Sequence, residues 1–356
     1  MSTQSSSSAS RRQLLTGAAA GGAAAALASA APAYAGRKDG DDHRGHPRGR
    51  QHGERDLPSG RQYVIQRGDQ RAVITEQGAG LRSYQVGGQE FLDTFSRDEF
   101  ATSATIGQLL VPFPNRIDHG RYTFRGTEYQ VPINEVSRDN AIHGLTRWMN
   151  WEVAHHDRHR LTMELVFHAQ PGYPFVLHVA QHFELTRWGL AVTDVVRNIG
   201  QDAAPYGVGM HPYLQVGTQT IDSNTLRIPA RQHMPQNDRL IPEPPAVSVE
   251  GTPYDFREPR RIGDFFMDRG FTDLIRDDDG LARMWLEHPS GSPRITMWLD
   301  EQRHWMWFYT GTPPNRTGLA TEGYTCCSDA FNNELGLRVI EPGSTFESSW
   351  GLMVDM

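Results

Sequence analysis

Short runs in which apolar and polar residues alternate recur along most of this chain. In residues 161–167, 177–185 and 294–299 the period is two, which places alternate side chains on opposite faces of a β-strand. Glycine and proline, 35 and 22 residues in all, punctuate the gaps between such runs. No long stretch has the i, i+3, i+4 spacing of a buried helix. We therefore predict an all-β protein of many antiparallel strands.

The first 35 residues indicate an export signal rather than a part of the fold. Arg11 and Arg12 precede an apolar run of mostly alanine and glycine, and Ala33-Tyr34-Ala35 offers a cleavage site. Twin arginines, a modest apolar run and an A-x-A site are typical of a Tat signal peptide. A membrane anchor is the alternative, but the run is short for a span. We expect export to an extracellular, periplasmic or cell-wall location, with no stable membrane insertion after cleavage.

Residues 36–60 have the composition of a disordered polar linker, with almost no apolar residue in 37–56. Its histidines, His43, His46 and His52, could bind a metal weakly, although a solvated linker accounts for them better. About 300 residues remain, which suits one large β-sandwich. We predict that residues 61–356 form this domain.

Charge and cysteine content exclude several classes of function. Removing residues 1–35 takes away two arginines and no acid, so the formal charge of −7 becomes −9. This balance predicts no nucleic-acid or anionic-lipid partner and counts against phosphorylated substrates. Cys326 and Cys327 are adjacent, so no disulfide framework is expected. No Cys/His spacing typical of zinc and no cofactor-binding motif is present, so we expect neither a metal nor a cofactor.

Three short segments, far apart in the chain, each carry one acid–base side chain. His143 lies in Ala-Ile-His-Gly-Leu, His211 in Gly-Met-His-Pro-Tyr, and Glu322 in Thr-Glu-Gly-Tyr-Thr. Two histidines and a carboxylate suffice to move protons on and off a neutral substrate near pH 7. Taken singly, each histidine is more simply a structural loop residue and Glu322 a surface acid. Asp329, in Ser-Asp-Ala-Phe-Asn, is a rival acid, although its neighbours suggest a structural turn.

Further polar and aromatic residues are candidates for binding a ligand. Arg116 follows Asn115 in a proline-rich segment, where a fixed guanidinium could donate to hydroxyls; an ordinary surface turn is the alternative. Trp148 could provide an aromatic platform for a sugar. Either Asp268 or Asp273 could accept hydrogen bonds from a sugar, and a turn or ion-pair role is equally open.

Taken in order, these motifs resemble the aldose 1-epimerase (galactose mutarotase) family. The order is Asn-Arg-Ile, His-Gly, His-Pro-Tyr, an aspartate, and then glutamate followed by Asp-Ala-Phe-Asn, from about Gln62 to the C-terminus. The residues around the two histidines are similar to those of the family's bacterial aldose 1-epimerase-like branch. The resemblance implies a galactose mutarotase-like supersandwich, a large antiparallel β-sandwich with a sugar-binding cleft.

The resemblance also implies roles for the candidate residues. Glu322 would take the proton from the anomeric hydroxyl, His211 would protonate the ring oxygen, and His143 would help hold the same region. The remaining candidates would bind the sugar or line its cleft: Arg116, Asp268, Asn115 and Trp148. Ring opening, rotation about C1–C2 and closure would interconvert the anomers of free hexoses such as glucose or galactose.

Two alternatives remain: a carbohydrate-binding protein on the same scaffold without epimerase activity, and a hexose-6-phosphate 1-epimerase. The expected partner is a small-molecule sugar, and the protein would be a monomer or a dimer. The chain departs from the family pattern directly after Glu322. Gly323-Tyr324 stands where family members usually carry proline and a small or apolar residue. Either a freer backbone at Gly323 or a cleft reshaped by Tyr324 is expected from this departure.

Overall fold

The alternating runs fold as the strands predicted for them. β11 (Arg160–Phe167) pairs antiparallel with β12 (Leu177–Leu185), which pairs antiparallel with β13 (Leu190–Asn198). Along β12 every odd-numbered side chain is buried, whereas the even-numbered ones are, with one exception, at least partly exposed. This is the pattern of a strand with one face in the core. The prediction of an all-β antiparallel fold is confirmed.

The computed structural model describes residues 57–99, 106–312 and 316–356. These residues belong to one unit, Gly53–Met356. The predicted export signal and residues 36–56 of the predicted linker lie outside the described residues. Within them, helix is limited to α1 (Ala330–Asn333) and the short 3-10 turns η1 (Val136–Arg138) and η2 (Ile221–Ser223). No helix in this described part is long and apolar enough to cross a membrane.

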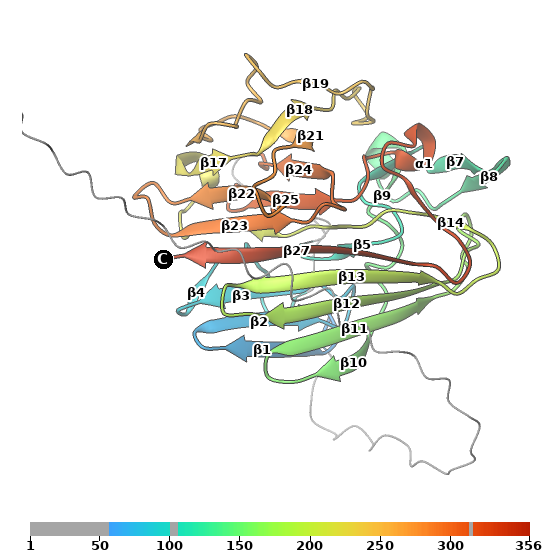
Figure 1. The fold of residues 1–356 in the computed structure, drawn as a ribbon, viewed down its shortest axis with the longest axis horizontal. Helices are drawn as coiled ribbons and strands as arrows, with labels where there is room; N and C mark the ends of the chain where they lie inside the picture. Colours follow the sequence, from blue (N-terminus) through green and yellow to red (C-terminus); the bar gives the residue numbers. More distant parts are fainter. Residues whose placement is uncertain (1–56, 100–105, 313–315) are drawn as a thin grey trace, which may run out of the picture. The chain divides into compact units, whose positions relative to one another are not determined.

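The largest sheet has nine strands in the order β10-β11-β12-β13-β27-β23-β22-β17-β20 (Figure 1). Its other members are β10 (Glu152–His156), β27 (Thr345–Asp355), β23 (Arg294–Leu299), β22 (Ala282–Glu287), β17 (Thr225–Arg227) and β20 (Arg260–Arg261). The C-terminal strand β27 lies between β13 and β23 and joins the two halves of this sheet.

A second sheet of six strands, in the order β16-β25-β24-β21-β18-β19, carries Glu322 and Asp268. Its members are β16 (Tyr213–Leu214), β25 (Leu319–Tyr324), β24 (Trp305–Tyr309), β21 (Asp268–Leu274), β18 (Ala230–His233) and β19 (Val247–Ser248). A Cβ placed on Gly323 of β25 would meet Leu299 Cδ2 of β23 at 2.4 Å. The two sheets therefore contact each other face to face through the core.

Smaller sheets complete the unit. A four-stranded sheet of β1 (Gln62–Arg67), β2 (Gln70–Thr75), β3 (Leu81–Val86) and β4 (Gln89–Glu90) lies beside β11 and β12 (Figure 1). The pairs are β5 (Leu109–Leu110) with β15 (Gly209–Met210), β6 (Arg116–Asp118) with β9 (Asn140–Ile142), β7 (Arg121–Phe124) with β8 (Thr127–Gln130), and β14 (Ala204–Tyr206) with β26 (Arg338–Ile340).

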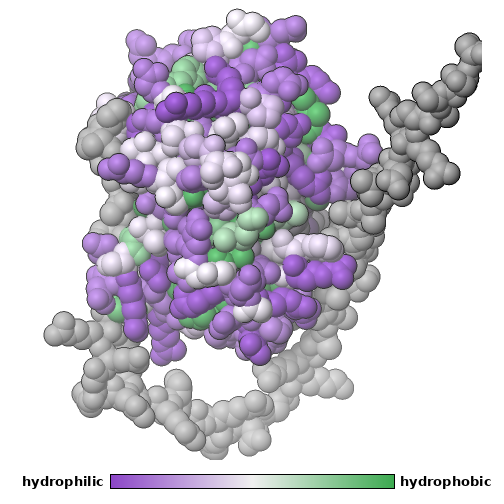
Figure 2. Space-filling model, turned by 90° about the vertical axis from the view of Figure 1, so that its left-hand side faces the viewer, coloured by the Kyte–Doolittle hydropathy of each residue, from purple (hydrophilic) through white to green (hydrophobic). Residues whose placement is uncertain are grey.

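Buried side chains from these sheets form one large hydrophobic cluster. A second, smaller cluster contains Leu110, Met234, Trp305, Trp307, Tyr324 and Cys327. On the face shown in Figure 2 the described residues are mainly hydrophilic and the hydrophobic ones are scattered. That face therefore presents no broad apolar surface for a partner.

Candidate active site

His143 directly follows β9 and is held by the loop before β6. Its backbone N–H donates to the carbonyl of Asn115 at 2.8 Å, and its φ of 63° turns the chain sharply. Gly144 continues the turn with φ +69°, and a Cβ there would meet the Val111 carbonyl oxygen at 2.2 Å. The missing Cβ lets the backbone of Gly144 lie against Val111, and this packing fixes the position of His143.

His211 lies between β15 and β16, where the chain crosses from one small sheet to the six-stranded sheet. Its carbonyl accepts a hydrogen bond from Gly107 N–H at 2.8 Å. Its ring stacks on the ring of Tyr213, with centroids 5.1 Å apart and planes 11° apart. The ring of His143 meets it edge-on at 4.9 Å. Backbone and ring contacts together give His211 a defined direction.

Glu322 lies within β25 and shares a sheet face with residues of the two neighbouring strands. It is directly opposite Trp307 of β24, and the Trp307 indole N–H donates to Asp268 Oδ1 of β21 at 2.8 Å. The indole crosses over Gly270, where a Cβ would lie 2.4 Å from the ring. Three adjacent strands therefore present Asp268, Trp307 and Glu322 on one side of the sheet.

The three predicted acid–base residues meet at one point. One ring nitrogen from each of His143 and His211 and a carboxylate oxygen of Glu322 all lie within 4.8 Å of one another. His211 Nε2 is 3.4 Å from Glu322 Oε1. The three residues are only 8%, 5% and 2% exposed, respectively. The structure thus brings together side chains that are 68 and 111 residues apart in sequence, and it does so inside the protein.

Burial pushes the groups of this site towards their neutral forms. It lowers the pKa of His211 to about 3, and it lowers the pKa of His143 well below the usual range, with the neighbouring His211 and Arg147 adding to the effect. Burial also raises the pKa of Glu322 well above its usual range, opposed by a hydrogen bond from Tyr324. These are the shifts expected for ionisable groups removed from water. Perturbed groups gathered in one place are typical of a functional site.

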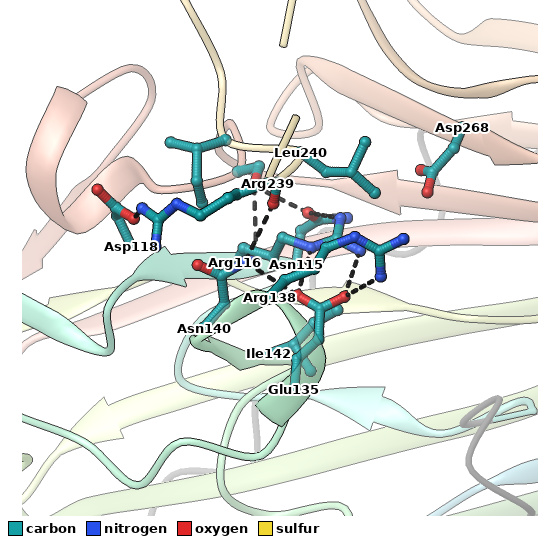
Figure 3. Close-up of polar contacts among 12 residues, drawn as sticks. Asn115, Arg116, Asp118, Glu135, Arg138, Asn140, Ile142, Arg239, Leu240 and Asp268 are labelled. Atoms are coloured by element: carbon teal, nitrogen blue, oxygen red, sulfur yellow. Dashed lines mark hydrogen bonds and ion pairs between the residues drawn. The ribbon is translucent and has the colours of Figure 1, made fainter. Parts of the chain in front are cut away.

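Arg116 is held by Glu135, an acid that was not among the residues predicted from the sequence (Figure 3). Its Nε and Nη2 donate to the two carboxylate oxygens of Glu135, each at 2.8 Å. Glu135 also accepts from Asn140 at 3.0 Å and from Arg138 at 3.1 Å. Burial lowers the pKa of Arg116, but Glu135 and Asp268 outweigh it and the net shift is upward. The Arg116 guanidinium is thus fixed, and its Nη1 donates to Asn115 Oδ1 at 3.2 Å.

Asn115 connects Arg116 to the carboxylate of Glu322 through Tyr324. Asn115 Oδ1 accepts from Arg116 and also from Ser328 Oγ at 2.8 Å. Its Nδ2 donates to the Tyr324 hydroxyl at 3.4 Å, and this hydroxyl donates to Glu322 Oε2. Tyr324 is completely buried. The residue noted in the sequence only as a departure from the family pattern is a direct partner of Glu322.

Trp148 lies at the surface, with 58% of the residue exposed. Its ring is covered on one face by the guanidinium of Arg147, 4.1 Å from the ring centroid. Arg147 is only 5% exposed, and burial lowers its pKa to about 10. None of the acids in the described part of the chain pairs with Arg147. The predicted role of Trp148 in a cleft wall stays a prediction, and Arg147 is a buried cation that sequence reasoning missed.

The rival acids of the sequence have other partners. Asp273 is at the surface and pairs with Arg231 at 3.3 Å, whereas Asp268 lies beside the site. Asp329 accepts from Asp118 N–H at 2.9 Å and from Asn332 at 2.7 Å, as expected for a structural turn. Cys326 and Cys327 are free buried thiols.

Gly323 does not loosen the strand that carries Glu322. It pairs with Met306 of β24, and its carbonyl accepts a hydrogen bond from Arg303 Nη1 at 2.6 Å. Arg303 is fully buried and forms an ion pair with Asp194, which is also buried. The absence of a Cβ on Gly323 makes room for the Leu299 side chain. The expectation of a freer backbone is therefore wrong, because sheet pairing and a buried arginine hold this glycine in place.

His143, His211 and Glu322 could in principle each supply one ligand to a metal ion. Two imidazoles and a carboxylate suit zinc or iron. A metal-bound histidine normally donates its other ring N–H to an acceptor. In both histidines Nδ1 is buried and has no hydrogen-bond partner among the described residues. The surroundings therefore lack the support that metal ligands usually have, and an acid–base role suits the three side chains better.

Comparison with known proteins identifies the family. The sequence model of the family described as aldose 1-epimerase matches residues 61–352. The chain belongs to the aldose 1-epimerase family. It is 32% identical over 286 residues to the Escherichia coli K12 protein YihR, which is described as uncharacterized; this covers 80% of the chain and 90% of YihR. The galactose mutarotase of Mus musculus is 28% identical over 162 residues, covering 43% of the chain and 46% of that protein.

Solved structures of the aldose 1-epimerase family agree in fold. The GalM/aldose epimerase homologue from C. elegans superposes with a TM-score of 0.74 at 17% identity, covering 83% of this chain and 98% of that one. At this identity the likeness supports the fold alone. The predicted mutarotase-like sandwich is confirmed, and the family relation confirms the resemblance read from the motifs.

Proposed function

We propose that the protein is an aldose 1-epimerase that interconverts the α and β anomers of free hexoses of the glucose or galactose type. Glu322 acts as the base at the anomeric hydroxyl, His211 as the acid at the ring oxygen, and His143 holds the same region of the sugar. The observation that carries the proposal is the 3.4 Å contact between His211 Nε2 and Glu322 Oε1 in a buried setting.

The spacing of this pair suits the chemistry. The anomeric hydroxyl oxygen O1 and the ring oxygen O5 are both bonded to C1, so the groups serving them must lie close together. An acid and a base in near contact meet this demand, whereas groups on opposite walls of a wide cleft would not. General acid–base help of this kind contributes roughly a hundred- to ten-thousand-fold in rate.

The protonation states of Glu322 and His211 also support their assignment as base and acid. A protonated Glu322 with a neutral His211 holds as many protons as a carboxylate with an imidazolium. Transfer of one proton across the contact converts the first form, which burial favours, into the second, which is the reactive one. During ring opening Glu322 takes the O1 proton while His211 gives one to O5. On closure the two groups exchange roles, and the enzyme returns to its starting state.

Other residues would position the sugar. Arg116 Nη1, Asn115 and Asp268 lie around the pair and are suited to bind hydroxyls, and Trp148 would contact the sugar from the surface side. Because the acid–base side chains are at most 8% exposed, a hexose reaches them only when covering atoms move aside. Hydroxyl binding by an arginine already fixed by Glu135 costs little side-chain entropy.

Polarimetry of freshly dissolved α-glucose and α-galactose tests the proposal. Folded wild-type protein should speed the change in rotation above the buffer rate for at least one sugar, and Glu322→Gln should abolish most of the gain. His233→Asn is a matched control, since His233 is also buried and its Nδ1 also has no partner in the described residues. Rates equal to buffer for both sugars would refute the activity. Tight sugar binding without turnover would instead favour the carbohydrate-binding alternative.

A hexose-6-phosphate 1-epimerase is the second candidate, and Arg147 favours it. The Arg147 guanidinium lies over the Trp148 ring, and its Nε has no hydrogen-bond partner among the described residues. No acid among these residues pairs with it. Such a group is suited to a phosphate. Comparing kcat/KM for glucose and glucose 6-phosphate in wild type and Arg147→Met decides between them. A selective loss for the phosphate would favour this candidate, and equal effects on both sugars would exclude it.

A further inference from the structure

We propose that Tyr324 is a positioning residue that aims the Glu322 carboxylate and stabilises its ionised form, leaving Oε1 for His211 and the sugar. The inference rests on the proposed role of Glu322 as the base. It concerns the residue at which this chain departs from the family pattern.

Strand geometry brings the two side chains together. Glu322 and Tyr324 are two residues apart on β25, so they project from the same face of the sheet. The Tyr324 hydroxyl contacts Glu322 Oε2, while Oε1 faces His211 Nε2 at 3.4 Å. The carboxylate therefore has one oxygen held by the tyrosine and the other turned towards the acid.

The direction of the hydrogen bond follows from the groups behind Tyr324. Arg116 Nη1 can only donate, so the Asn115 atom that it meets at 3.2 Å is Oδ1. Asn115 Nδ2 then faces Tyr324 and donates to its hydroxyl oxygen at 3.4 Å. With its oxygen already accepting, the hydroxyl uses its own proton for Glu322. A chain of donors thus runs from a fixed cation to the carboxylate, and each bond polarises the next.

Packing prevents the hydroxyl from swinging away. The Tyr324 ring is completely buried and lies against Gly209, where a Cβ would be 2.3 Å from the ring. It also stacks on Trp307, with centroids 6.3 Å apart and planes 27° apart. Tyr324 donates a hydrogen bond to one oxygen of the Glu322 carboxylate, and the other oxygen faces His211.

Removing this donor should make Glu322 harder to ionise. Burial raises the pKa of Glu322, and the Tyr324 hydroxyl opposes that rise. A hydrogen bond to a charged group has a strength that corresponds to a shift of about one to two pH units. Tyr324→Phe keeps the ring and its packing but loses the hydroxyl.

The first test is the dependence of kcat/KM on pH, measured by polarimetry. In Tyr324→Phe a smaller share of the enzyme should hold the reactive carboxylate–imidazolium pair, so the plateau of kcat/KM should fall. The alkaline limb, at which Glu322 loses its proton, should move about one to two units to higher pH. Tyr206→Phe is the matched control, because Tyr206 is also fully buried but its hydroxyl has no partner in the described part of the chain; its profile should equal that of wild type. An unchanged plateau, or an unmoved alkaline limb, would overturn the inference.

The second test reads the carboxyl group directly and does not require activity. Infrared difference spectra give the titration of the buried carboxyl band, which is assigned to Glu322 by its loss in Glu322→Gln. The band should persist to higher pH in Tyr324→Phe than in wild type. If wild type has no epimerase activity but this shift occurs, the proposed function fails and the inference on Tyr324 stands. If wild type is active and the titration is unchanged, the inference fails alone.

A second variant covers the case in which Tyr324→Phe does not fold. Asn115→Leu removes the group that directs the tyrosine proton and leaves the hydroxyl in place. It should move the Glu322 titration in the same direction by a smaller amount. An unmoved titration in this variant would also overturn the inference.

Discussion

Replacing Arg303 by methionine would break an ion pair buried under the strand that carries Glu322. Arg303 is fully buried, and its Nη2 pairs with Asp194 Oδ2. Asp194 is also almost fully buried. Its Nη1 holds the Gly323 carbonyl at 2.6 Å. Methionine fills much of the space but leaves Asp194 with Gln181, at 2.8 Å, as its remaining side-chain partner.

Breaking such a pair from one side costs about 3–5 kcal/mol in the free energy of unfolding, because a buried charge is left uncompensated. The cost should depend on pH. Burial raises the pKa of Asp194 to about 6 although Arg303 opposes the rise, so loss of Arg303 raises this pKa further. A folded-state pKa above the unfolded value means that stability is lost as the pH rises through it. Methionine should therefore cost more at high pH, by about 1.4 kcal/mol for each unit of further pKa shift.

Urea unfolding near pH 5 and near pH 8 measures this effect. We expect Arg303→Met to be destabilised by about 3–5 kcal/mol at the higher pH and by clearly less at the lower one. The double variant Arg303→Met/Asp194→Leu is the control and should recover most of the loss, since apolar replacement of a buried pair is often neutral. A cost below about 1 kcal/mol at the higher pH, or one equal at both pH values, would refute the reasoning.

Three further outcomes are expected. Gly323→Ala should cost about 1–3 kcal/mol in urea unfolding, because its Cβ would lie 2.4 Å from Leu299 Cδ2; an unchanged midpoint would contradict this. His211→Phe should flatten the acid loss of stability: burial lowers the His211 pKa from 6.5 to about 3, so its contribution is present above pH 6.5 and is lost as the pH falls, by about 1.4 kcal/mol per unit. If the free energy of unfolding changed with pH equally in His211→Phe and wild type, this prediction would be wrong. Glu135→Gln should raise KM for the hexose more than it lowers kcat, since it loosens the Arg116 fork; the reverse split in polarimetric kinetics would oppose a binding role.

Much of the fold could be predicted because antiparallel strands with one buried face have a visible period. Residues 161–167 and 177–185 carry that signal and form the antiparallel pair β11 and β12. The order of strands in space carries no such signal. β27 pairs with both β13 and β23, and these contacts join segments more than a hundred and about fifty residues apart. Such pairings depend on the packing of whole sheets rather than on local pattern.

The candidate site was predicted in part. His143, His211 and Glu322 were found from the order of their motifs, and the structure brings them together. Tyr324 was visible as a neighbour of Glu322, and its position two residues along a strand could have suggested a shared face. Glu135 could not have been found in this way, because it reaches Arg116 from the segment preceding a short 3-10 turn.

Other residues have no local signal at all. Arg303 and Asp194 are 109 residues apart, and nothing near either residue indicates a buried pair. A buried arginine is rare enough that sequence reasoning assigns such residues to the surface. The buried pair that holds the Gly323 carbonyl can therefore be recognised only from the three-dimensional structure.

The rate of anomer exchange in Glu322→Gln, compared with wild type, tests the central claim most directly. Magnetisation-exchange NMR on equilibrated glucose or galactose gives this rate without a coupled assay. We expect the enzyme-dependent rate to fall by roughly a hundred- to ten-thousand-fold, while His233→Asn keeps the wild-type rate. A folded Glu322→Gln protein that exchanges the anomers as fast as wild type would contradict the assignment of Glu322 as the base.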